Sequence, residues 1–133
     1  QIITPEKTVF DDQVSQVGLP TQLGQITVLP HHVSLITTVE PGEIVFEHNH
    51  RISRLAAGFG FAQVAADEVK VLVDLAAPEE EIEEKKIEEA KRAAEEALRQ
   101  KHMLSEEEYA TAAANLQKAL VQLKIKRRRH ARI

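Results

Sequence analysis

The sequence predicts a mainly β N-terminal domain, a flattened β-sandwich of about ten strands, followed by a C-terminal antiparallel α-helical hairpin. Up to Leu75, short runs rich in Val, Ile, Thr and Phe are interrupted by turn residues at intervals of about 8 to 12. Beyond Pro78, β-branched residues almost vanish and strong helix formers dominate. The chain has 133 residues, enough for one domain or for a small domain with an appendage. We therefore expect two parts, 1–77 and 78–133.

Nine runs in the first part have the composition of strands. They cover residues 1–4, 7–10, 13–19, 24–28, 34–39, 43–47, 51–57, 60–65 and 68–74. Alternation of apolar and polar side chains is clearest over 13–17, which predicts one buried and one wet face there. We expect His48-Asn49-His50 to form a hairpin tip, because Asn tolerates positive φ.

The first helix is expected to run from about Pro78 to Lys101. Proline is favoured in the first turn, and the acidic residues that follow it suit the positive end of the helix dipole. One apolar stripe recurs at spacings of three and four, with Ile82 near its edge. Its members are Ile87, Ala90, Ala94 and Ala97.

The second helix is expected to begin with a capping box, in which Ser105 accepts from a backbone donor and Glu108 reaches back. Its apolar face holds Tyr109, Ala112, Ala113, Leu116, Ala119, Leu120 and Leu123. The short connection predicts antiparallel helices with close backbones. Because alanine buries little apolar area, the hairpin should be weakly held and could act as a switch. The alternative is that the alanine stripes pack tightly and never open.

Charge is distributed unevenly along the helical part, although the formal net charge of the chain is only −4. Residues 79–108 hold twelve Glu against six Lys and Arg, whereas residues 109–133 hold seven Lys and Arg and no acid. Such asymmetry favours an interaction segment, with a merely solvated face as the alternative.

Several classes of site have no support in the sequence. Without cysteine there is no disulfide and no thiolate ligand or nucleophile. No nucleophile elbow or phosphate-binding loop is present, and the pairs His31-His32 and His48-x-His50 lack a third ligand at a recognisable spacing. No apolar run approaches the roughly 20 residues of a membrane helix. We expect a protein that is not an enzyme, holds no metal and reaches a membrane only through a partner.

The basic end, residues 124–132, supports two hypotheses. It docks against an acidic protein surface, where Arg–carboxylate contacts give orientation as well as attraction, or it binds nucleic acid phosphates. The lack of nearby aromatic side chains and the acidic balance of the chain favour the first. Under either hypothesis, these cations also complement the negative end of the second helix.

One motif connects the chain to a known family. A Gly, an apolar strand, Leu-Pro, a His, and an apolar run with Thr that ends in Pro-Gly are matched by Gly24, Leu29, Pro30, His32, Leu35, Thr37, Pro41 and Gly42. The match departs from the family pattern at Thr27, Ser34 and Phe59, whereas Gly60-Phe61 and both C-terminal helices follow in the expected order. Over essentially its whole length, the chain resembles the epsilon subunit of bacterial F-type ATP synthases.

The resemblance implies a non-catalytic rotor subunit of the central stalk, which couples proton flow to ATP synthesis. In that family the sandwich grips the gamma subunit and sits on the c-ring. The implied contacts here are Gly24, Gln25, Ile26, Pro30, His31 and His32. An extended form of the helices inhibits ATP hydrolysis by meeting an acidic segment of the beta subunits, within the alpha/beta assembly. The implied partners are Arg127, Arg128 and Arg129. The place implied is the cytoplasmic face of the bacterial plasma membrane, since no transit segment is visible.

Some members of the family bind regulatory ATP through an Ile/Leu-Asp-x-x-Arg-Ala motif in the first helix. The aligned positions here keep Ile82, replace Asp and Arg conservatively with Glu83 and Lys86, and put the bulkier Ile87 in place of Ala. Lys86 cannot reproduce a planar guanidinium, so we expect ATP binding to be weak or absent. The alternative to the whole assignment is an unrelated β-sandwich adaptor whose basic helix binds nucleic acid or an acidic protein.

Overall fold

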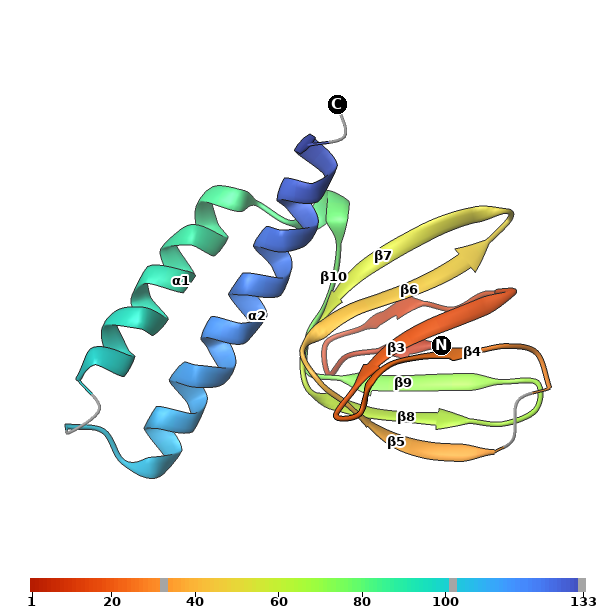
Figure 1. Cartoon of the computed structure of the whole chain (residues 1–133), viewed down its shortest axis with the longest axis horizontal. Coiled ribbons are helices and arrows are strands. Elements are labelled where there is room, and N and C mark those ends of the chain that lie inside the picture. Colours follow the sequence, from red (N-terminus) through yellow and green to blue (C-terminus); the bar gives the residue numbers. More distant parts are fainter. Residues whose placement is uncertain (32–33, 101–102, 132–133) are drawn as a thin grey trace. The chain divides into compact units, whose positions relative to one another are not determined.

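The chain folds as two five-stranded sheets followed by two helices, which confirms the predicted fold class (Figure 1). The computed structural model describes residues 1–31, 34–100 and 103–131, with only the backbone over 128–131. The contacts divide the chain into two compact units, Gln1–Pro78 and Glu79–Ile133. The first is the sandwich and the second is the helical hairpin.

The first sheet has the strand order β2-β1-β9-β8-β5. Its strands are β1 (Ile2–Ile3), β2 (Thr8–Phe10), β5 (Leu35–Val39), β8 (Gly60–Val64) and β9 (Val69–Val73). Strand β1 pairs in parallel with β9, and the other pairs are antiparallel. The β8–β9 hairpin is therefore the centre of this sheet, with Phe61 directly opposite Leu72.

The second sheet has the order β10-β7-β6-β3-β4 and is antiparallel throughout. Its strands are β3 (Gln16–Thr21), β4 (Gly24–Val28), β6 (Gly42–His48), β7 (Arg51–Ala57) and β10 (Ala76–Pro78). His48 pairs with Arg51 across a two-residue turn, in which Asn49 and His50 have φ of 52° and 62°. Two positive φ values match the right-handed twist of the strands, and the predicted hairpin tip is confirmed.

The core lies between the two sheets. Its most completely buried large side chains in the sandwich are Leu19, Val39, Ile44, Val64 and Val71. In β8 and β9 alternate residues point inward, because successive side chains of a strand face opposite sides of the sheet. Full burial of such a side chain contributes about 1.5 to 3 kcal/mol, so this unit is a firm platform for its loops.

The strand predicted over 13–19 is observed over Gln16–Thr21 as β3, so its predicted start was wrong. Before it, the Asp12 carboxylate accepts from the Gln13 amide at 2.7 Å. The alternation predicted over 13–17 is present, with Gln13 and Ser15 exposed, Val14 half-buried and Val17 buried. Beyond that stretch, residues 17–20 are all buried. The side chain of Gln25 lies over Gly18, and Pro20 lies against Gly42, so residues on both faces are covered.

The prediction that the first helix begins at Pro78 was also wrong. Pro78 pairs with Leu55 as the last residue of β10, a strand that the sequence did not indicate. Proline is tolerated there because β10 is an edge strand and needs no donor on its outer side. A 3₁₀ turn, η1 (Glu79–Glu81), follows, and helix α1 runs over Glu84–Arg99.

Helices α1 and α2 (Glu106–Ala131) lie antiparallel, as predicted (Figure 1). Ser105 starts α2: its hydroxyl accepts from the Glu108 amide and donates to the Glu108 carboxylate, both at 3.1 Å. The capping box is confirmed, with the carboxylate bonded to the hydroxyl of Ser105.

The apolar stripes are narrower than predicted. In α1 only Ala94 is buried, Ile87 and Ala97 are half-buried, and Ala90 is exposed. In α2 the predicted members Ala112, Ala119 and Leu123 are buried, whereas Tyr109 and Leu120 are exposed. Helix α2 also buries Gln122 and Ile125, which the predicted face did not include.

Gly60 is required by the close approach of β8 and β9. A Cβ atom added there would lie 1.9 Å from the Leu72 carbonyl oxygen and 2.7 Å from the Val73 Cα. Because both atoms belong to the backbone, a strand would have to move.

We expect Gly60→Ala to lower the free energy of unfolding of the sandwich by about 2 to 3 kcal/mol, the upper range for overpacking. Urea unfolding of the full chain, followed by the NMR signals of the buried methyl groups of Val71 and Val73, measures this. Gln63→Ala, at an exposed position of the same strand, is the control and should change stability little. Equal stability of the two variants would contradict the close approach.

Candidate functional site

The two segments predicted to contact partners lie at opposite ends of strand β4. Gly24, Gln25 and Ile26 begin the strand, and Pro30 and His31 follow its end. Six residues of extended chain separate Gly24 from Pro30, about 20 Å at about 3.3 Å per residue. The structure therefore does not bring these residues together into one site.

The first end is a tight turn with an apolar tip. The Thr21 hydroxyl donates to the Gly24 carbonyl at 2.7 Å and accepts from the Leu23 amide at 3.2 Å, and Gly24 has a φ of 107°. Leu23 is 99% exposed. Leu23 was not among the predicted contact residues, although a large apolar residue inside a polar turn is a visible signal in the sequence.

Gln25 is exposed and Ile26 is half-buried. The Gln25 side chain folds back across β3 and donates to the Glu43 carbonyl at 3.4 Å, and Ile26 is half-buried against the core. Of the three residues predicted at this end, only Gly24 lies in the turn itself.

The second end is held to the β8–β9 turn. His31 is exposed, has a φ of 65°, and its amide donates to the Ala66 carbonyl at 3.0 Å. Together with Pro30 it lines a cavity of about 460 Å³, whose lining also includes Asp11 and Asp67. His32, the third residue predicted there, lies outside the described residues.

A second surface was not predicted at all. Ile36, Phe61 and Leu72 lie on the outer face of the first sheet and are 74%, 60% and 53% exposed. Phe61 and Leu72 are directly opposite each other, and Ile36 is diagonal to Phe61 because Thr38 is the partner of Phe61. Large apolar residues gathered on the wet face of a sheet mark an interaction surface. We call these three residues the outer apolar patch.

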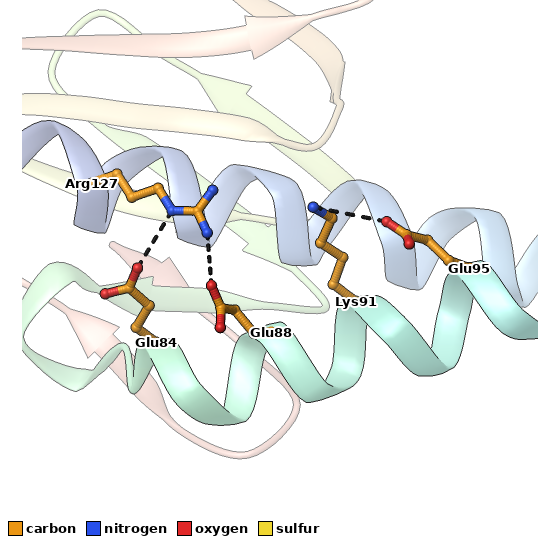
Figure 2. A network of polar contacts seen from close by, with 5 residues as sticks. All are labelled: Glu84, Glu88, Lys91, Glu95 and Arg127. Atoms are coloured by element: carbon orange, nitrogen blue, oxygen red, sulfur yellow. Dashed lines mark hydrogen bonds and ion pairs between the residues drawn. The ribbon is translucent and has the colours of Figure 1, made fainter.

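Among the predicted arginines, Arg127 is engaged within the hairpin (Figure 2). Its Nε donates to Glu84 Oε1 at 3.4 Å and its Nη2 donates to Glu88 Oε1 at 2.8 Å. Both carboxylates are on α1, one turn apart. Arg128 and Arg129 belong to α2, but their side chains lie outside the described residues.

The positions aligned with the nucleotide motif differ in burial. Ile82 is buried and Ile87 is half-buried. Lys86 Nζ lies 3.3 Å from Glu83 Oε2, so these two charges, three residues apart, are paired with each other.

The histidine pair His48-x-His50 is divided by the hairpin turn. His48 Nδ1 lies 2.7 Å from the Gln13 carbonyl oxygen and Nε2 lies 3.4 Å from Asp12 Oδ2, so this ring ties the turn to the segment before β3. Among the described residues, no three metal-ligating side chains gather in a cluster.

The comparisons with known proteins decide the family. Residues 1–79 match the family described as ATP synthase, Delta/Epsilon chain, beta-sandwich domain. The ATP synthase epsilon chain of Herpetosiphon aurantiacus is 33% identical over 132 residues, which cover 99% of this chain and 96% of that one. This chain belongs to the ATP synthase epsilon chain family.

Other relatives and solved structures agree. The ATP synthase epsilon chain of Dehalococcoides mccartyi is 36% identical over 99% of this chain and 95% of its own. A chain in the structure of the Euglena gracilis mitochondrial ATP synthase, OSCP/F1/c-ring, has a TM-score of 0.74 at 20% identity, with 91% of this chain and 75% of that chain covered. The second likeness shows the shared fold.

Membership confirms the predicted class: the chain is a non-catalytic stalk subunit of ATP synthase. The alternative of an unrelated β-sandwich adaptor is set aside by relatives that match over the whole length. No helix in the described part of the chain is long and apolar enough to span a membrane.

Proposed function

We propose that this epsilon chain is a rotor subunit that couples proton flow through the membrane c-ring to ATP synthesis, at the cytoplasmic face of a bacterial plasma membrane. A structural neighbour from Tetrahymena thermophila, with a TM-score of 0.59 at 11% identity, comes from the central stalk and c-ring of a mitochondrial ATP synthase. The observation that carries the proposal is a firm sandwich with two contact ends held about 20 Å apart along β4. A subunit that transmits rotation needs a rigid body between two attachments.

The two ends of β4 contact two different subunits in this proposal. One is gamma and the other is the c-ring, because a single small contact could not reach from Gly24 to His31. The outer apolar patch faces gamma, since a long-lived contact within a rotor suits apolar burial better than a sliding one. The turn at Leu23 and the His31 segment then make the remaining contacts with gamma and the c-ring.

We predict that single cysteines at Leu23 and His31 cross-link to different subunits of the assembled complex. The chain has no native cysteine, so each introduced thiol is unique. Phe61→Cys reports on the outer apolar patch and should cross-link to gamma, whereas Ser53→Cys, on an exposed position of β7, is the control. Cross-linking of Leu23→Cys and His31→Cys to one and the same subunit would refute the two-contact arrangement.

The helical hairpin restrains ATP hydrolysis in this proposal. Its basic end, with Arg127, Arg128 and Arg129, meets an acidic surface of the beta subunits. Charge-assisted contacts from several arginines to carboxylates supply both affinity and orientation.

ATP hydrolysis by an epsilon-depleted complex, titrated with the full chain, tests this role. We expect a chain ending at Pro78, where the sandwich ends, to bind without inhibiting. Changing Arg127, Arg128 and Arg129 together to Ala should weaken inhibition about tenfold or more, because each lost charge pair is partly desolvated. Changing the exposed cations Lys85 and Arg92 to Ala is the control. If the triple variant inhibits as strongly as the full chain, the basic end is not the brake.

We further propose that regulatory ATP binds this chain weakly or not at all. The ion pair of Glu83 with Lys86 and the bulk of Ile87 argue against a nucleotide site. Calorimetric titration of the full chain with ATP should give no sub-millimolar binding. The variant with Lys86→Arg and Ile87→Ala restores two of the three replaced family residues, leaving Glu83, and should bind more tightly than the parent. Sub-millimolar binding by the parent would overturn the proposal.

A further inference from the structure

The seam between α1 and α2 buries few side chains of α1. In that helix only Ala94 is buried. Helix α2 buries Ala112, Ala119, Gln122, Leu123 and Ile125. Because an alanine methyl group removes little area from water, polar contacts between the helices add to the apolar contact in holding the hairpin closed.

Arg127 makes such a contact at the end of the hairpin farthest from its turn. It bridges 43 residues of chain to Glu84 and 39 to Glu88. The guanidinium lies between the two carboxylates, and its Nε and Nη2 donate to different acids (Figure 2). Because Glu84 and Glu88 are four residues apart in one helix, both project from the same face toward α2. A planar fork with several donors fits two acceptors in a way that Lys cannot.

The neighbouring ion pairs on α1 do not join the two helices. Lys91 pairs with Glu95 at 3.8 Å, and Arg99 pairs with Glu96 at 3.2 Å. Each joins residues of one helix, so it supports α1 without joining it to α2. These pairs supply matched controls, because their loss changes charge on α1 and leaves the link to Arg127 intact.

We propose that Arg127 with Glu84 and Glu88 forms a latch that keeps the hairpin closed and keeps Arg127 from an acidic partner. The latch pair of acids imitates such a partner, offering two carboxylates one helical turn apart. Arg127 exchanges its internal carboxylates for external ones when the hairpin opens. The inhibitory consequence rests on the function proposed above, whereas the latch itself concerns only the free chain.

The latch has a definite electrostatic signature. All three side chains are partly exposed, with Arg127 at 54%, so salt screens the contact. Two exposed ion pairs of this kind shift the equilibrium between open and closed hairpins by about threefold to tenfold. A shift of that size changes the fraction of open chains without unfolding either helix.

Spin labels on the isolated full chain measure the opening. Cysteines in place of Ala90 and Gln117, exposed neutral positions on α1 and α2, report the distance between the helices by electron–electron resonance. Glu84→Gln with Glu88→Gln should raise the ratio of open to closed chains about threefold to tenfold. The same change should abolish most of the increase in opening that salt produces in the parent chain.

Two further variants separate the latch from general effects of charge. Glu89→Gln with Glu96→Gln removes two charges from α1. It should leave the ratio of open to closed chains as it is in the parent. Arg127→Glu should open the hairpin, and its combination with Glu84→Lys and Glu88→Lys should close it again. Equal open fractions in the parent and in the Glu84→Gln, Glu88→Gln chain, whether both are closed or both open, would overturn the latch.

The hydrolysis assay then distinguishes failure of the latch from failure of the proposed function. With both correct, Glu84→Gln with Glu88→Gln inhibits at a lower concentration than the parent chain. If the free chain opens as expected but never inhibits the complex, the latch stands and the inhibitory role fails. If the parent inhibits while the free-chain ratio does not respond to the glutamine changes, the inhibitory role stands and the latch fails.

Discussion

The burial of one sheet against the other is the interaction on which the rest of this epsilon chain depends. Strands β3, β6, β8 and β9 supply most of the large inward side chains, and each sheet covers the inner face of its partner. This leaves the outer faces of the sheets and the turns that flank β4 outside the core. Leu23, His31 and the outer apolar patch occupy those free positions. The surfaces that can hold partners are thus a consequence of how the core is closed.

The two units are stabilised by different means, and the difference suits different roles. The sandwich buries branched and large apolar residues between sheets, and it tolerates close backbone approach at Gly60. The helices of the hairpin bury a smaller apolar set, Ala94, Ala112, Ala119, Leu123 and Ile125, to which a cap at Ser105 and ion pairs along the sides are added. The proposed function assigns rearrangement to this unit, which has the smaller core.

The structure explains how the separated charges of the helical unit interact. The acid-rich first half and the basic end are far apart in sequence, but the antiparallel hairpin brings Glu84 and Glu88 beside Arg127. In the proposed function, the same cation has these internal acceptors in the closed hairpin and external acceptors on the partner. Weak, exposed ion pairs suit an exchange of partners, because a strong buried ion pair would not exchange.

Much of the fold followed from local patterns. The strand at 24–28, the tip at His48-Asn49-His50, the cap at Ser105 and the antiparallel helices were all predicted, since turn residues, caps and periodicity act over a few residues. The predictions failed where residues distant in the sequence decide the local structure. Pro78 became the last residue of a strand because β7 offers it an edge, and the strand predicted over 13–19 begins only at Gln16, where its pairing with β6 starts.

The candidate sites divide in the same way. The sequence by itself determined the family, the two-part architecture and the polarised charge of the helices, because these depend on composition, order and short motifs. Only the tertiary structure decided that Gly24 and His31 lie at opposite ends of a strand, that Phe61 and Leu72 join Ile36 in one exposed patch, and that Arg127 is held by α1. Those facts depend on pairing register and on packing between segments far apart in the chain, which no local pattern encodes.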